Sequence, residues 1–194
     1  MNRRTILKFA GGAVMNAALV GGFGAALIRP ATATPDAASD PSASAASEAR
    51  RLSLINTHTG ETFRGAYWES GAYQPEALQA INRVMRDHRS QEVHAIDTAL
   101  LDQLAALYVT LGASQPYEII SGYRSPATNA ALQARSEGVA TRSLHMDGRA
   151  IDVRIAGVNL SDLRDAAISA RRGGVGYYEA SDFVHLDTGR VRRW

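Results

Sequence analysis

Three side chains in the second half of the sequence could together bind a metal ion: His145, Asp152 and His185. Zinc hydrolases need three nitrogen or oxygen ligands and one open position, where a bound water becomes acidic enough to attack a carbonyl carbon. These residues supply such a set if a loop and two neighbouring strands converge at one point. Their spacing also fits a histidine in a capped loop and a hydrogen-bonded aspartate in the core, so both interpretations stand at this point.

The residues around the three side chains predict the elements that would position them. Alternating apolar and polar residues over 149–155 indicate a strand that contains Asp152. The same pattern in "DFVHLD" predicts a strand that contains His185. His145 lies in a loop before Gly148, and a glycine there allows the chain to turn so that His145 folds back toward Asp152.

The rest of the domain reads as a mixture of helices and short strands joined by short turns. This mixture predicts an α+β fold, with a mostly antiparallel sheet and flanking helices. The expected elements are a hairpin turning at "THTG", helices over 75–86 and 99–111, a strand over 117–121, a helix opened by Ser125 and Pro126, a helix beginning at Leu160 with Ser161 as its cap, and a strand at "GVGYY" joined to the last strand by a turn over 179–182.

The first 33 residues have the composition of an export signal. Arg3 and Arg4 precede an uncharged stretch rich in glycine and alanine, and small residues follow it, which is the order of a twin-arginine-type signal peptide. The alternative is an uncleaved membrane anchor. Residues 34–49 are small and polar, which predicts a flexible linker. Residues 50–194 are then expected to form one domain.

Charge and cysteine content exclude several classes of function. Four of the 21 basic residues and none of the 19 acids lie in the first 33 residues, so the remainder carries 17 basic against 19 acidic residues. Such a chain lacks the positive charge that binds nucleic acid. The sequence has no cysteine, which excludes disulfide scaffolds, thiolate metal sites and cysteine nucleophiles. We expect a monomer whose only contact with a membrane would be an uncleaved signal.

Three segments in order carry a resemblance to a known family. "SGYRSPATN" begins at residue 121, "SLHMDGRAIDV" at 143 and "GGVGYYEASDFVHLDTG" at 173. Together they resemble the M15 zinc peptidases of bacterial cell walls, and most of all the branch formerly called a domain of unknown function, DUF882. The segments "LSLINTHTGE" and "INRVMRDHRSQEVHAID" also resemble that branch, so the similarity covers nearly all of residues 51–190.

The resemblance implies a fold, a metal and a substrate. The fold would be that of the hedgehog and D-Ala-D-Ala peptidases, with His145, Asp152 and His185 as ligands of Zn²⁺. The substrate would be the stem peptides of peptidoglycan in the periplasm, and the reaction would be the hydrolysis of their cross-links. Two alternatives stay open: a D,D- or L,D-carboxypeptidase specificity, and an inactive zinc-containing module that only binds peptidoglycan.

Arg124 and Asp187 are candidates for supporting roles. Arg124 would bind the substrate carbonyl or the oxyanion as attack proceeds, which the resemblance favours over an ordinary surface or loop-holding role. Asp187 lies two residues after His185 on the same face of its strand. It could orient a ligand histidine, bind a substrate amine, or cap the following turn.

The general base is less clear from the residue pattern. Related enzymes place a glutamate three residues before the last zinc histidine or a histidine two residues before it, whereas this sequence has Asp182 and Phe183 there. Glu179 has the spacing from His185 that a glutamate near the zinc-bound water has in the hedgehog domain. A carboxylate could take the proton from that water. Glu179, Asp182 or neither could therefore be the base, and Glu179 is the first choice.

Overall fold

The computed structural model describes residues 49–135 and 140–194, which belong to one compact unit. The predicted signal over 1–33, and the predicted linker over 34–49 apart from Ala49, lie outside the described residues. No helix among the described residues is long and apolar enough to cross a membrane.

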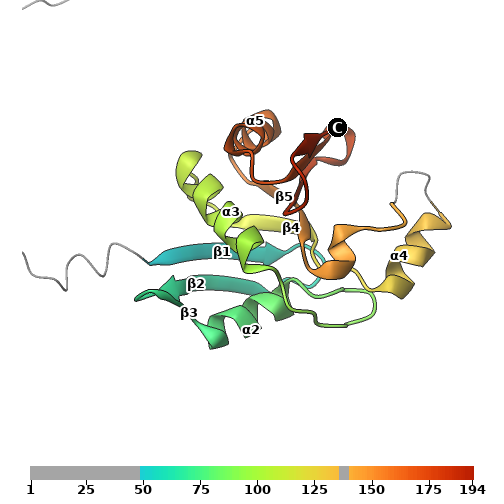
Figure 1. Cartoon of the computed structure of the whole chain (residues 1–194), viewed down its shortest axis with the longest axis horizontal. Helices are drawn as coiled ribbons and strands as arrows, with labels where there is room; N and C mark the ends of the chain where they lie inside the picture. Colours follow the sequence, from blue (N-terminus) through green and yellow to red (C-terminus); the bar gives the residue numbers. More distant parts are fainter. Residues whose placement is uncertain (1–48, 136–139) are drawn as a thin grey trace, which may run out of the picture. The chain divides into compact units, whose positions relative to one another are not determined.

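The described residues form an α+β fold around one eight-stranded sheet, which confirms the predicted class (Figure 1). The strand order is β3-β2-β1-β4-β5-β7-β6-β8. The sheet is mixed, because β1 pairs with β4 and β6 with β8 in parallel, while the other five pairings are antiparallel. The strands are β1 (Arg50–Asn56), β2 (Thr62–Glu69), β3 (Ala72–Tyr73), β4 (Tyr117–Ser121), β5 (Ala150–Ile155), β6 (Gly174–Tyr178), β7 (Phe183–Asp187) and β8 (Arg192–Arg193).

Four α-helices and two short 3₁₀ helices complete the described part. They are α2 (Pro75–Val84), α3 (Thr98–Thr110), α4 (Pro126–Gln133), η1 (Leu144–Asp147), α5 (Leu160–Ala170) and η2 (Glu179–Ser181). Ser125 caps α4 as predicted, since its side chain accepts a hydrogen bond from the Thr128 amide. The prediction that Ser161 caps α5 is wrong. The chain turns into this helix at Asn159, whose carbonyl accepts the amide of Leu163, and Ser161 lies in the first turn.

The two faces of the central strands have different environments. Ile151 and Val153 of β5 and Val184 and Leu186 of β7 are buried in the hydrophobic core. Helix α5 packs on β5, β6 and β7, and helix α3, which lies next to α5 in Figure 1, packs on β1. Because side chains alternate along a strand, Asp152 of β5 and His185 and Asp187 of β7 point to the opposite face. One face therefore stabilises the sheet, and the other is free for polar chemistry.

A β-bulge ends the ladder between β4 and β5 close to Asp152. Ile119 pairs with Val153, but the next pair is Ser121 with Asp152, so one residue of β4 is skipped. Bulges of this kind redirect side chains and are common beside active sites. Here the bulge turns Ser121 to the polar face and leads the chain into the loop that carries Gly122 and Arg124.

Candidate metal centre

His145 is fixed by the short helix η1 and the glycine that ends it. Gly148 has φ +65, which is the left-handed region, so the chain reverses there as predicted and enters β5. The His145 side chain is 3% exposed, and its Nδ1 donates to the carbonyl oxygen of Gly122 at 2.7 Å. The amide of Arg124 donates to the His145 carbonyl. The loop after β4 thus holds both the ring and the backbone of His145.

Asp152 and His185 are direct cross-strand partners on β5 and β7. The Asp152 Oδ1 atom lies 2.8 Å from His185 Nδ1 and 3.3 Å from His145 Nε2. The two ring nitrogens, His145 Nε2 and His185 Nδ1, are 3.2 Å apart. The structure therefore brings together all three predicted ligand residues, one from the short helix η1 and two from neighbouring strands, with one potential ligand atom of each at a common point.

The hydrogen bonds on the outer side of each ring decide which nitrogen carries a proton. The Gly122 carbonyl and the Asp187 carboxylate can only accept, so His145 Nδ1 and His185 Nε2 are donors toward them. When both rings are neutral, His145 Nε2 and His185 Nδ1 present lone pairs to each other and to the Asp152 carboxylate. Three lone pairs that meet without a donor repel one another unless a cation lies between them.

The pKa shifts at the cluster agree with a preference for positive charge. Burial by itself raises the pKa of Asp152, but the neighbouring His145 and His185 rings outweigh it and hold that pKa well below its usual value. Burial lowers the pKa of His185, whereas hydrogen bonds with Asp152 and Asp187 raise it, and the net shift is upward. The lowered pKa keeps Asp152 anionic, and the raised pKa of His185 shows that a positive charge beside this carboxylate is favoured.

The donor set and its spacing suit zinc. A tetrahedral zinc ion with ligand bonds of about 2.0–2.2 Å needs ligand atoms about 3.3–3.5 Å apart. The three separations of 2.8, 3.2 and 3.3 Å are close to that, and small movements would reach it. Two imidazoles and one carboxylate also leave a fourth position open, as catalytic zinc sites do.

Asp187 orients His185 from outside the cluster. Its Oδ2 accepts from His185 Nε2 at 3.1 Å and from Arg192 Nη2 at 2.7 Å, while its Oδ1 accepts the amides of Gly174 and Gly189. The side chain is completely buried. Of the three roles that the sequence leaves open for Asp187, this contact supports the orientation of a ligand histidine.

Arg124 lies at the edge of the cluster with part of its hydrogen-bonding capacity unused. Its Nη2 is 3.8 Å from Asp152 Oδ2 and 3.3 Å from Ser121 Oγ, and its Nη1 is 3.3 Å from Asn129 Oδ1. The Nε atom is buried without a partner among the described residues. A buried guanidinium with long contacts and an unused donor can bind an additional acceptor.

A cavity of about 360 Å³ opens beside the cluster and contains Arg124 as well as the three candidate ligands. Neither predicted base lines it. The Asp182 Oδ2 atom is held 2.8 Å from Arg154 Nη1. The Glu179 side chain is exposed, and its carboxylate has no hydrogen bond or ion pair to any described residue. Ser181, between them, does line the cavity.

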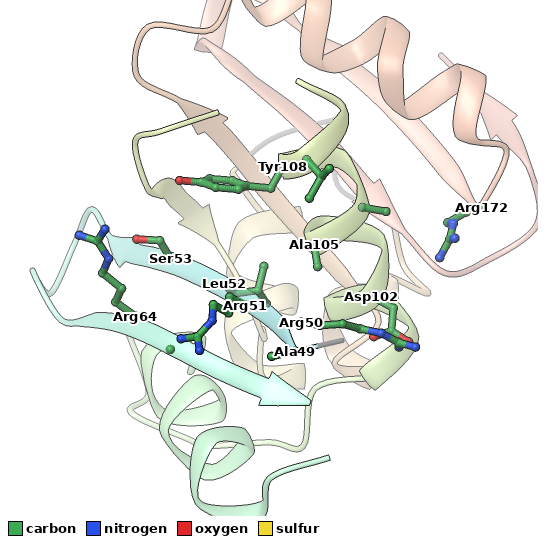
Figure 2. Close-up of a pocket in the computed structure, with 13 residues that line it drawn as sticks. Ala49, Arg50, Arg51, Leu52, Ser53, Arg64, Asp102, Ala105, Tyr108 and Arg172 are labelled. Carbon is green, nitrogen blue, oxygen red and sulfur yellow. The ribbon is translucent and has the colours of Figure 1, made fainter. Parts of the chain in front are cut away.

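A larger hollow of about 870 Å³ lies elsewhere, between β1, β2 and α3 (Figure 2). Its side chains include Arg51, Arg64 and Arg172, and its one acid among the described lining residues is Asp102, which Arg50 neutralises at 2.8 Å. It contains none of the candidate ligands, so size does not identify the reactive site in this molecule.

Arg192, Ser121 and Gly122 support the cluster, and Trp194 lies beside it, but none of the four was predicted from the sequence as a site residue. The residues at 192 and 194 belong to the short basic stretch "RVRRW", which has no periodic pattern. Gly122 and Ser121 could have been found from "SGYRSP", the motif that holds Arg124, because a glycine there allows close approach of two backbones. A β-carbon at Gly122 would lie 2.4 Å from the Met85 carbonyl oxygen.

The family model and the relatives that match this chain carry the same description. Residues 44–194 match the model of the family described as peptidoglycan L,D-endopeptidase MepK. The peptidoglycan L,D-endopeptidase MepK of Escherichia coli (strain K12) is 48% identical over 145 residues, which are 75% of this chain and 80% of that protein. The probable peptidoglycan L,D-endopeptidase MepK of Haemophilus influenzae is 42% identical over 146 residues, 75% of this chain and 78% of that protein.

Proposed function

This chain belongs to the M15 peptidase family described as peptidoglycan L,D-endopeptidase MepK, and from that premise we propose that it is a zinc-dependent murein endopeptidase. It hydrolyses peptide cross-links between the stem peptides of peptidoglycan. The observation that carries the metal-dependent chemistry is the meeting of His145 Nε2, Asp152 Oδ1 and His185 Nδ1, which have no donor among them when both rings are neutral.

In this proposal His145, Asp152 and His185 hold Zn²⁺, and the fold is of the hedgehog and D-Ala-D-Ala peptidase type. Zinc, when bound, supplies a Lewis acid and lowers the pKa of a bound water to about 7. The protein keeps the imidazoles in the required tautomers through Gly122 and Asp187. With this arrangement neither imidazole would need to change tautomer when the metal binds.

Arg124 is proposed to bind the carbonyl oxygen of the scissile peptide bond. Its guanidinium lines the cavity beside Asp152, and its buried Nε has no partner among the described residues. Negative charge that develops on the carbonyl oxygen during attack would be stabilised by this fixed cation. The long contacts to Ser121 and Asn129 position the guanidinium and leave donors for the substrate.

The proton acceptor is proposed to be neither Glu179 nor Asp182. Both carboxylates are exposed and outside the cavity, and Asp182 is paired with Arg154. A general base must reach the attacking water, directly or through one further water. Glu179 could do so only if η2 moved toward the cavity. Replacement of Glu179 by glutamine tests this directly.

The proposed site of action is the periplasm, reached through the twin-arginine-type signal predicted over residues 1–33. The substrate lies outside the cytoplasmic membrane, so export is a requirement of this function. We expect the exported protein to work as a monomer, with peptidoglycan stem peptides as its partners.

Digestion of purified peptidoglycan sacculi tests the function. The zinc-loaded protein should convert cross-linked muropeptides to uncross-linked ones, as seen by chromatography, and a chelator should stop the reaction until zinc is restored. His145→Ala should lower the rate by about 10³-fold or more, because it removes one ligand. Intact cross-links after prolonged incubation of the zinc-loaded protein would overturn the proposal.

A further inference from the structure

Residues 192–194, called here the 192–194 arm, return from β7 and lie along β6. Arg192 and Arg193 pair in parallel with Gly174 and Val175. The amide of Trp194 donates to the Val175 carbonyl at 3.2 Å, and the Trp194 carbonyl accepts the amide of Tyr177 at 3.1 Å. These bonds involve only backbone atoms, so the course of the arm does not depend on the Trp194 side chain.

Two glycines of β6 make room for the side chains of the arm. Gly176 is the cross-strand partner of His185, and a β-carbon there would lie 2.7 Å from Cε2 of Trp194. A β-carbon at Gly174 would lie 2.3 Å from Arg192 Nη1. Larger residues at these positions would therefore displace the indole and the guanidinium. Gly174 and Gly176 thus allow the arm to pack closely beside the candidate metal cluster.

The indole of Trp194 is held by contacts with three other side chains, and part of its surface is exposed to solvent. Its ring is 5.3 Å from the His185 ring, its Nε1 donates to the Tyr178 hydroxyl at 2.8 Å, and the Arg192 guanidinium lies 4.7 Å from its centroid. The residue is nevertheless 50% exposed and lines the cavity that contains Arg124. A large aromatic surface that is both fixed and open loses little entropy when it binds a ligand.

We propose that Trp194, with Tyr178, forms the wall of the cavity on which the substrate peptide lies. This inference rests on the proposed function, which supplies the ligand: a stem peptide with flat peptide groups and the aliphatic side chain of its cross-linking residue. Such groups pack on an indole face, while the carbonyl of the cleaved bond reaches Arg124 across the cavity. Trp194 is a substrate-binding residue in this scheme, and His185 is held by Asp152 and Asp187 without it.

Kinetics on a soluble cross-linked muropeptide dimer test the role of Trp194. Trp194→Ala should raise KM about five- to tenfold and leave kcat within about twofold, because it removes contacts made equally in the ground and transition states. Trp194→Phe should recover most of the loss. Zinc content should equal that of the wild type in both variants. Arg193→Ala is the matched control, since Arg193 is in the same strand with an exposed side chain, and its KM should not change.

Binding of the same dimer separates this inference from the proposed function. In the His145→Ala background, Trp194→Ala should weaken the affinity by the same factor as it raises KM. If the wild type leaves the dimer intact, the proposed function fails while the affinity comparison still tests Trp194. An unchanged KM and affinity, a loss of zinc in Trp194→Ala, or an equal effect of Arg193→Ala would overturn the inference.

Discussion

Each imidazole of the cluster has its outer nitrogen hydrogen-bonded to a group that can only accept, and this determines which nitrogen faces the centre of the cluster. Gly122 fixes His145 so that Nε2 points inward, and Asp187 fixes His185 so that Nδ1 points inward. The two histidines thus present different nitrogens to the cluster, although both are candidate ligands of the same ion. Asp187 in turn depends on Arg192 and two backbone amides, which makes the orientation of His185 a property of several residues.

At the scale of single residues, we predict that the exposed carboxylates of Glu179 and Asp182 do not act as the general base. Glu179→Gln and Asp182→Asn should each keep kcat within about threefold of wild type, because neither side chain lines the cavity. The measurement is the initial rate of cross-link hydrolysis at saturating substrate, with zinc content determined in parallel. A fall in the rate of Glu179→Gln by about a hundredfold, with zinc retained, would contradict this and identify Glu179 as the base.

At the scale of elements, the junction between η1 and β5 places His145 against Asp152. Gly148 has a positive φ, and a β-carbon there would lie 2.2 Å from the Ala95 carbonyl oxygen. The amide of Asp97 donates to the Gly148 carbonyl at 2.9 Å, so the loop before α3 is tied to this turn. Both the backbone conformation and the space around it require glycine.

Two glycine variants separate these requirements. Gly60 also has positive φ, but a β-carbon there would meet nothing within 4 Å. We expect Gly60→Ala to lower the free energy of unfolding by about 1 kcal/mol. Gly148→Ala should lower it by about 3 kcal/mol, since the steric clash adds to the conformational cost, and should also weaken zinc binding. Urea unfolding and zinc titration check this, and equal losses of stability in the two variants would contradict the clash.

The elements that the sequence predicts well are those with a complete local signal. The turn "THTG" between alternating strands identified the hairpin of β1 and β2, and Ser125 with Pro126 identified the start of α4. The parallel pairing of β1 with β4 could not be predicted from a local signal. It joins residues about sixty positions apart, and the connection between them contains two helices. Strands β3 and β8 have two residues each and are too short to show alternation.

The candidate site was predictable to the extent that it depends on residue type. The three candidate ligand residues were predicted from chemistry and motif, and the structure brings them together. Among their supporting groups, the orientation of a ligand histidine was one of the roles that the sequence left open for Asp187. Gly122 and Arg192 were not predicted, because Gly122 contributes only a backbone carbonyl and Arg192 acts from another strand. Such roles depend on tertiary packing and on a bulge in β4, and neither leaves a periodic pattern in the sequence.

At the scale of the whole molecule, stability should depend on pH through His88. Its ring stacks on His58 with centroids 3.8 Å apart, and burial, followed by Arg89 and His58, lowers its pKa to about 4. In the unfolded chain the His88 ring binds a proton near its ordinary pKa of about 6.5. The stability that neutral His88 contributes is therefore complete above pH 6.5 and is lost as the pH falls toward 4.

Urea unfolding at a series of pH values measures this dependence. The free energy of unfolding of the wild type should decline between pH 6.5 and 4, and His88→Asn, which cannot titrate there, should show a smaller decline. His94→Asn is the control for the replacement of a histidine, because His94 stacks on Tyr123 and lies outside this histidine pair. Identical slopes in wild type and His88→Asn would show that another group is responsible.

The central claim is that His145, Asp152 and His185 hold one zinc ion, and X-ray absorption at the zinc edge tests it most directly. The protein loaded with one equivalent of zinc should show two imidazole nitrogens and low-atomic-number oxygen ligands at about 2.0–2.2 Å. His145→Ala should lose one imidazole from that shell. A spectrum without imidazole ligands, or one that His145→Ala leaves unchanged, would contradict the account.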